Sequence, residues 1–155
     1  MEPLLLSIHV LASIVFVGGS AVATSLFPRF APVAVAVPGP AAEDASPGER
    51  DHAVAALLHR ITRGYAIAGI IVPVVGIILA AVQDRMGEVW ITVAMILTAA
   101  AGMLLATQIH PRQRDALREP GDPRGLRTLS MLAGIYNLVW AVVVVLMIVR
   151  PGSEV

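Results

Sequence analysis

A histidine lies inside the first apolar stretch of the sequence, residues 4–27. His9 could bind a haem or a metal ion, or take up and release a proton near neutral pH, and ionisable residues inside such stretches are often functional. On a helix with about 100° per residue, His9 shares a face with Ser13 and Ser20, which we expect to point into a helix bundle. The alternative interpretation is a neutral histidine that is hydrogen-bonded to a hydroxyl or carbonyl group of a neighbouring helix.

Small and polar residues recur along the other apolar stretches at spacings that predict close helix packing. In residues 129–149, Asn137 shares a helix face with Ser130 and Gly134, so we expect Asn137 to hydrogen-bond across a helix interface. Small residues four positions apart give further expected packing positions: Thr98, Gly102 and Ala106, and Gly19 with Ala23.

The remaining histidines do not form a recognisable metal motif. His52 and His59 lie about two helical turns apart, whereas metal pairs usually have a closer spacing such as i and i+4, so we interpret them as part of a solvated helix face. His110, at the end of the third apolar stretch, differs in depth from His9. The sequence has 0 cysteines and no HExxH, Ser-His-Asp or glycine-rich phosphate motif. We therefore expect no catalytic residues, no metal and no cofactor.

The composition indicates the elements that must position these residues. The chain has 155 residues, of which 57% are hydrophobic and 14% charged, against roughly 45–50% and 25% in soluble domains. Its apolar stretches, residues 4–27, 65–82, 89–107 and 129–149, contain no Asp, Glu, Lys or Arg, and each approaches the roughly 20 residues that cross a bilayer as a helix. The sequence predicts an all-α membrane protein, a single domain of four transmembrane helices in a bundle, and excludes a soluble enzyme. Because 11 basic and 11 acidic residues balance, a nucleic-acid partner is not expected.

Prolines and capping residues set the expected boundaries at 3–27, 47–82, 89–109 and 128–149. Pro28 and Pro32 should end the first helix, leaving an irregular loop over residues 28–46. Ser46 and Glu49 have the spacing of a capping box, so the second helix should start at Pro47. Its first part is amphipathic, and we expect this part to project from the membrane. A polar loop is expected at 108–128.

Arginine counting predicts the orientation, because short cytoplasmic loops are enriched in basic residues. The chain has 11 basic residues, all arginine, and only Arg85 and Arg150 lie outside the loops 28–64 and 108–128. These two loops should therefore be cytoplasmic, with both termini outside a bacterial plasma membrane. Tyr65 and Trp90 lie near the expected membrane boundaries, and we expect them to act as interfacial anchors.

The first helix carries a recognisable pattern, formed by residues 8–12 (IHVLA), 16–19 (FVGG) and 25–29 (SLFPR). It resembles the start of a bacterial family of small, four-helix predicted integral membrane proteins of unknown function. One branch looks like the prokaryotic respiratory supercomplex association factor of actinobacteria. That resemblance implies a non-catalytic accessory or assembly subunit whose partners are subunits of the cytochrome bc complex and cytochrome c oxidase.

Two other families are similar in the same helix. In membrane protoporphyrinogen oxidases, the first helix carries a histidine, then a glycine, and ends in proline and arginine. The same order occurs here in His9, Gly18 or Gly19, and Pro28 with Arg29. This likeness implies a haem-binding oxidoreductase in which His9 is the haem ligand, but the chain lacks the intramembrane lysine of those enzymes. Copper-resistance D-type membrane proteins share the HVLA-like opening, and that likeness implies a small copper-related transporter. We rank these two functions below the accessory subunit.

Overall fold

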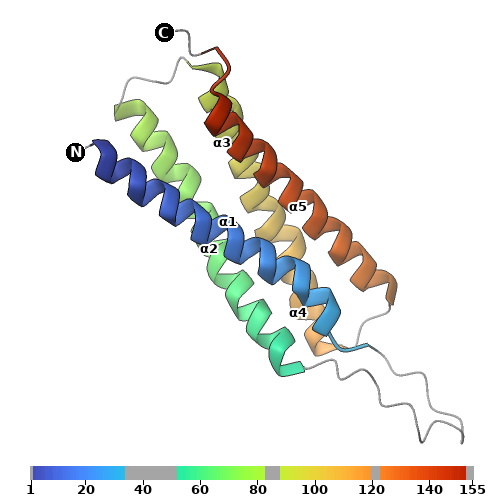
Figure 1. Cartoon of the computed structure of the whole chain (residues 1–155). Helices are drawn as coiled ribbons and strands as arrows, with labels where there is room; N and C mark the ends of the chain where they lie inside the picture. Colours follow the sequence, from blue (N-terminus) through green and yellow to red (C-terminus); the bar gives the residue numbers. More distant parts are fainter. Residues whose placement is uncertain (1, 34–51, 83–87, 120–122, 153–155) are drawn as a thin grey trace, which may run out of the picture.

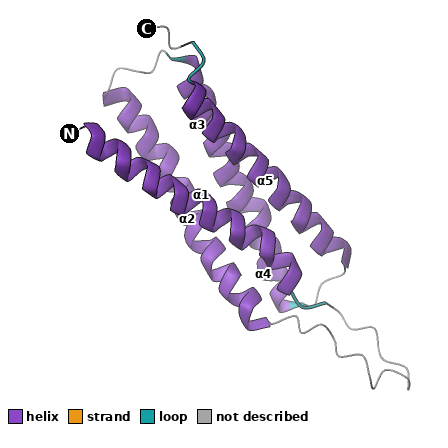
Figure 2. Cartoon of the chain, viewed as in Figure 1, coloured by secondary structure: helices purple, strands orange, loops and turns teal. Residues whose placement is uncertain are grey.

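The helices account for almost all of the described chain. The structure, a computed structural model, describes residues 2–33, 52–82, 88–119 and 123–152, without the side chains of residues 2–10 and 69–82. The helices in chain order are α1 (Glu2–Phe30), α2 (His52–Val82), α3 (Val89–Leu104), the π-helical turn η1 (Leu105–Ile109), α4 (His110–Arg118) and α5 (Pro123–Val149) (Figures 1 and 2). The expected all-helical class is thus confirmed.

The long helices form a bundle in which each one packs against two neighbours. α1 contacts α2 and α5, and α3 contacts the same two helices from the other side. The long helices α1, α2, α3 and α5 run alternately in opposite directions, so that α1 begins and α5 ends at the same end of the bundle (Figure 1). α4 continues α3 at the other end, where it packs against the first turns of α2.

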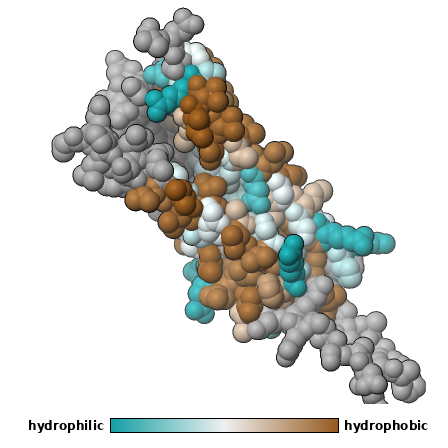
Figure 3. All heavy atoms as spheres, in the orientation of Figure 1, coloured by the Kyte–Doolittle hydropathy of each residue, from teal (hydrophilic) through white to brown (hydrophobic). Residues whose placement is uncertain are grey.

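Among the residues with described side chains, three helical segments are long and apolar enough to cross a membrane: Leu11–Phe30, Val89–Arg118 and Pro123–Val149. Their outward faces carry large apolar side chains, such as Leu11 at 64% and Leu138 at 65% exposure. Brown, hydrophobic atoms cover much of the described surface over α1 and α5 in Figure 3. Exposed apolar side chains are favourable in lipid. Most side chains of the remaining predicted span, 65–82, lie outside the described part of the chain.

The interior is built from small residues and a few large aromatic ones. Ala23, Ala101 and Ala133 are at most 2% exposed, and so are Phe27 and Tyr136. Alanine lets helix backbones approach closely where lipid provides no hydrophobic driving force, and packing itself then stabilises the contact. The large rings fill the remaining space, Phe27 near the end of α1 and Tyr136 near the middle of α5.

α1 extends beyond its predicted end at residue 27 and reaches Phe30, with Pro28 inside its last turn. Proline removes the hydrogen bond from its own nitrogen, yet the N–H of Ala31, just beyond the helix, still donates to the Phe27 carbonyl at 2.9 Å. A proline so close to the end of a helix leaves few later bonds to disturb. The predicted start of α2 at residue 47 lies outside the described residues, which resume at His52, the first residue of α2.

The third helix differs most from expectation, because it continues through η1 and α4 to Arg118 instead of ending near residue 109. The His110 N–H donates to the carbonyl of Leu105, five residues earlier. This π-type turn places Pro111 in the first turn of α4, where a missing N–H is tolerated. α5 then begins at Pro123, before the predicted residue 128. Much of the expected polar loop 108–128 is therefore helical.

Candidate functional site

One end of the bundle carries most of the charged side chains that the structure describes. We call it the arginine-rich end; it comprises the last turn of α1, the first part of α2, α4 and the start of α5. Here α2 and α4 pack along each other, with Ala55, Leu58 and Ala116 buried between the helices of this end. The amphipathic stretch before residue 65 is thus one member of a packed pair of helices.

His59, His110 and Gln113 meet at the interface of α2 and α4, and Thr62 is buried one turn further along α2. We call His59, Thr62, His110 and Gln113 the histidine junction. The rings of His59 and His110 are stacked, with centroids 4.6 Å apart and an interplanar angle of 18°. His59 Nδ1 lies 3.4 Å from Gln113 Oε1, and this contact is a hydrogen bond when Nδ1 carries the proton. Gln113 and Thr62 are both 0% exposed.

The surroundings of the histidine junction disfavour a protonated imidazole. Burial lowers the pKa of His59 below its ordinary value, the hydrogen bond with Gln113 raises it, and the charges of Arg114 and Arg63 lower it further. Because the lowering effects dominate, His59 is neutral at neutral pH. The folded histidine junction thus favours the neutral form of the His59 ring.

Several buried polar atoms of the histidine junction have no hydrogen-bond partner among the described residues. They are Thr62 Oγ1, His110 Nε2 and Gln113 Nε2. Unpaired polar atoms inside a protein cost free energy, because they lose the hydrogen bonds that water would supply. Two of these atoms belong to His110 and Gln113, which contact His59, so the polar groups at the contact between α2 and α4 are only partly hydrogen-bonded.

The stacked pair is poorly arranged to share a metal ion. A bound metal lies in the plane of each imidazole, about 2.0–2.1 Å from its nitrogen, and two nearly parallel stacked planes do not converge on one point. Among the described residues, no group of three or more His, Cys, Asp or Glu side chains could hold a metal. What the arrangement can do is gain or lose protons.

The histidine junction was not predicted from the sequence. His59 was assigned with His52 to a solvated face; the structure leaves His52 exposed and turns half-buried His59 towards His110. The missed signal is a repeated spacing, with His59 and Thr62 three residues apart and His110 and Gln113 likewise. Residues three apart share a helix face, but α4 had been expected to be a loop.

A second polar network links α1 to α5, with one bond buried and one at the surface of the bundle. The Tyr136 hydroxyl donates to Ser20 Oγ at 2.9 Å, and Asn137 Nδ2 donates to Ser25 Oγ at 2.9 Å. Ser20 Oγ in turn donates to the carbonyl of Val17 at 3.1 Å. The structure thus places Ser20 and Asn137, which the sequence singled out, at the contact between α1 and α5.

The other residues singled out as packing positions have different environments. Thr98 and Gly102 are buried, and Ser13, Gly19 and Ala106 are half-buried. Gly134 is exposed, and a Cβ added there would meet no atom within 4 Å. Ser130, from the same expected stripe, is also exposed and bonds only the Leu126 carbonyl of its own helix. α5 is therefore turned so that Asn137 faces α1 while Gly134 faces outward. The side chain of His9 lies outside the described part of α1.

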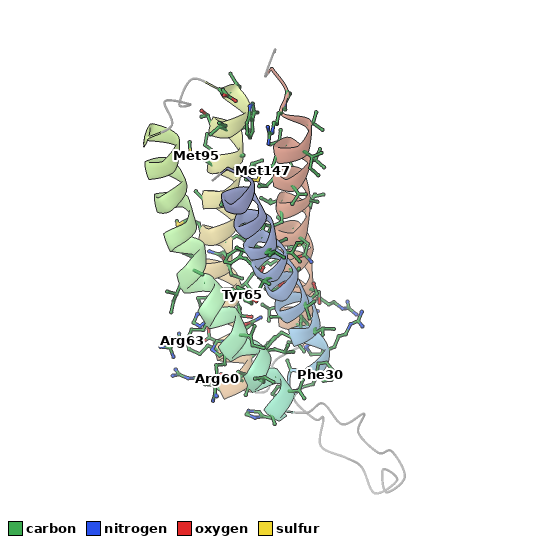
Figure 4. All side chains as sticks on the ribbon, turned by 60° about the vertical axis from the view of Figure 1, so that its left-hand side comes forward. Phe30, Arg60, Arg63, Tyr65, Met95 and Met147 are labelled. Atoms are coloured by element: carbon green, nitrogen blue, oxygen red, sulfur yellow. The ribbon has the colours of Figure 1, made fainter. Side chains whose placement is uncertain are left out.

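The two expected membrane anchors have specific contacts. The Tyr65 hydroxyl donates to the carbonyl of Val15 at 3.1 Å, and its ring meets Phe16 edge-on, with centroids 5.4 Å apart. In Figure 4, Tyr65 lies where α1 and α2 approach each other, so its contacts join these two helices. At the opposite end, Trp90 Nε1 donates to Glu88 at 2.6 Å, and the guanidinium of Arg150 lies 5.9 Å from the Trp90 ring.

Two open, mainly apolar grooves flank α1. The groove between α1 and α2 has a volume of about 470 Å³ and includes Phe16 and Tyr65 in its lining. The groove between α1 and α5 has about 390 Å³ and is lined by Asn137 and Trp140 among apolar residues. Both grooves open onto the apolar outer surface, where acyl chains or another helix would fit better than a polar substrate.

Replacing Asn137 with Ala should lower the free energy of unfolding by about 0.5–1.5 kcal/mol, the range of interhelical hydrogen bonds in membranes. The reason is the loss of the Asn137–Ser25 bond. Ser130→Ala is the matched control on the same helix, and it should have almost no effect because Ser130 bonds only its own helix. Unfolding by denaturant in detergent micelles measures both; equal losses would contradict the assignment.

Comparisons of the chain with protein-family models, with curated proteins and with solved structures find no match. The functional proposal therefore rests on the contacts and charges of the chain itself.

Proposed function

We propose that the chain is a non-catalytic accessory or assembly subunit of a larger membrane complex. The observation that carries this proposal is the packed pair of α2 and α4, which presents exposed arginines on an ordered helical platform: Arg60, Arg63, Arg112, Arg114 and Arg118. Asp115 and Glu119 are the acidic side chains described on α4 and at its end. The platform is therefore strongly basic.

An ordered basic surface suits recognition of an acidic protein surface. Arg60 and Arg63 point away from the bundle in Figure 4, so their guanidinium groups are accessible. Arginine binds carboxylates through two parallel hydrogen bonds, and complementary charges guide and orient association. Because α2 and α4 are already packed, binding would order few further residues, and less conformational entropy would be lost.

The outward faces of the intramembrane helices support the same proposal. Gly134 is exposed on α5 with open space around it, and Ala141 is exposed on the same helix. Small residues on an outer face allow a second helix to approach closely. A partner helix could thus pack along α5 while the arginine platform contacts a partner domain outside the membrane.

The proposed orientation follows from the arginines. We propose a bacterial plasma membrane with the arginine-rich end in the cytoplasm and both termini outside, because basic residues are retained on the cytoplasmic side. The resemblance of residues 8–29 to the respiratory association factor makes the cytochrome bc complex and cytochrome c oxidase the partners to test first. This partner is an inference from that resemblance.

Neutralising the platform should weaken the complex. With Arg60, Arg112 and Arg118 all changed to Gln, we expect recovery of partner subunits in a mild-detergent purification to fall by about tenfold or more, equivalent to about 1.4 kcal/mol. The physical reason is the loss of three charges that face a complementary surface. Quantitative mass spectrometry of the purified sample measures this recovery.

The matched control changes the same three residues to Lys, which keeps the positive charge and should retain most of the partner. Both variants must be present in the membrane at the wild-type level, since arginines also influence topology. If the Gln variant brings down as much partner as the wild type, the platform is not the docking surface.

A further inference from the structure

We propose that the histidine junction is a proton-sensitive contact that is closed when His59 and His110 are neutral and opens when they are protonated, releasing α4 from α2. This inference goes beyond the accessory role, because it assigns a conformational response to the chain on its own. It rests on the geometry of the stacked pair, on the charges around it and on the local construction of α4.

The stacked geometry makes the contact sensitive to charge. Two neutral imidazoles can pack face to face, and the rings of His59 and His110 do so with centroids 4.6 Å apart. If both rings became cations they would repel each other at close range, with part of the interface shielded from water. Protonation would thus turn an attractive contact between the helices into a repulsive one.

Charged groups on both helices reinforce this effect. α2 supplies Arg63 and α4 supplies Arg114, and the charges of both act on both histidines. η1 carries no charged residue, and the charged residues of α1 and α5 at this end of the bundle are Arg29, Arg124 and Arg127. On the acidic side, Asp115 lies 3.5 Å from Arg114 at the surface, and Glu119 is exposed at the end of α4.

The direction of the pH response follows from the protonation state of His59 that the folded protein favours. Burial and the two arginines lower the pKa of His59 in the folded protein. A group whose pKa is lowered by folding favours the folded state when it is neutral, so its contribution is fully present above its ordinary pKa. The stabilisation by neutral His59 is lost progressively as the pH falls through the ordinary pKa of histidine and towards the lowered pKa in the folded protein. Acidification should therefore open the contact.

The local construction of α4 lowers the cost of opening. Thr62 Oγ1, Gln113 Nε2 and His110 Nε2 lack hydrogen-bond partners among the described residues while the contact is closed, and water would supply partners once it opens. α4 is joined to α3 through the π-turn Leu105–Ile109 and Pro111. Irregular turns of this kind often occur at functional sites, and here the turn gives α4 a position at which to bend.

The experiment uses the absence of cysteine from the sequence. Spin labels on Leu57→Cys in α2 and Arg118→Cys in α4, both exposed positions, report the separation of the two helices in lipid nanodiscs. Between about pH 7.5 and about pH 5, the interval in which histidines change charge, the distance distribution should broaden and shift to longer distances. The labels report on the chain alone, so the result does not depend on whether a partner subunit binds.

Variants that cannot titrate identify the source of the movement. With His59→Gln and His110→Gln together, the distribution should stay at its neutral-pH form across the whole range. His52→Gln, an exposed histidine on the same helix, should respond as the wild type does. If the double Gln variant already differs at neutral pH, His110→Phe offers a second test, because it keeps a ring in the stack and removes a titrating group. An unchanged wild-type distribution, or movement that persists without these histidines, would overturn the proposal.

Discussion

Changing Tyr136 to Ala is expected to lower the free energy of unfolding by about 3–5 kcal/mol, the range for truncating a buried aromatic side chain. Tyr136 is 0% exposed and is the largest fully buried side chain among the described residues. Its hydroxyl donates to Ser20 at 2.9 Å, and its ring packs edge-on near Trp140, with centroids 6.3 Å apart. The variant would therefore lose both packing and a hydrogen bond at the contact between α1 and α5.

Two control variants separate these contributions. Tyr136→Phe keeps the ring and should cost about 0.5–1.5 kcal/mol, the value of a single hydrogen bond. Ile135→Ala truncates a neighbour that is 44% exposed and should change stability by no more than about 0.5 kcal/mol. Equilibrium unfolding in mixed detergent micelles measures all three. A Tyr136→Ala protein as stable as the Ile135→Ala protein would contradict the described packing of α5 on α1.

Gly19→Ala is expected to destabilise the chain by about 1–3 kcal/mol, the cost of overfilling a packed contact. A Cβ at Gly19 would overlap the hydroxyl and the ring of Tyr65. Tyr65 cannot move away freely, because its hydroxyl donates to the Val15 carbonyl and its ring packs on Phe16. The substitution should therefore separate α1 from α2.

Gly18 provides a matched control one residue away in the same helix. A Cβ there would meet no atom within 4 Å, so Gly18→Ala should be neutral or stabilising by up to about 1 kcal/mol, the helix-propensity difference. Combining Gly19→Ala with Tyr65→Ala should cost less than the sum of the single changes, because the clash is then absent. Equal effects of Gly18→Ala and Gly19→Ala would show that Tyr65 does not occupy the described position.

The parts of the fold that the sequence predicted are those governed by long apolar stretches. The apolar stretches 89–107 and 129–149 both lie within observed helices. A helix is expected for such a stretch because it satisfies all backbone hydrogen bonds within one segment in lipid. Ser20 and Asn137 lie at the α1–α5 contact for a related reason: polar groups in an apolar helix need partners on another helix. Gly134 shares its helix face with Asn137 only approximately, and this small angular difference leaves it exposed.

The features that the sequence did not predict depend on local geometry and on contacts between distant segments. Pro111 and the polar composition of residues 108–128 suggested a loop, yet one π-turn places Pro111 where a helix tolerates it. Once α4 exists, its position beside α2 brings His110 to His59, a pairing that no spacing within either segment could reveal. The contacts of Tyr65 with Val15 and Phe16 in α1 are a further pairing of distant segments that its place in the chain does not reveal.

The accessory-subunit proposal is tested most directly by purifying the tagged full chain from its native membranes in a mild detergent. Protein identification and an absorption spectrum should be taken on the same sample, for the wild type and for His9→Ala. The proposal predicts larger membrane subunits in stable association, with cytochromes present if the partner is respiratory, and the same spectrum and partners for His9→Ala. A protein that is purified alone and carries a haem spectrum that disappears in His9→Ala would contradict the proposal and would indicate a haem-binding enzyme.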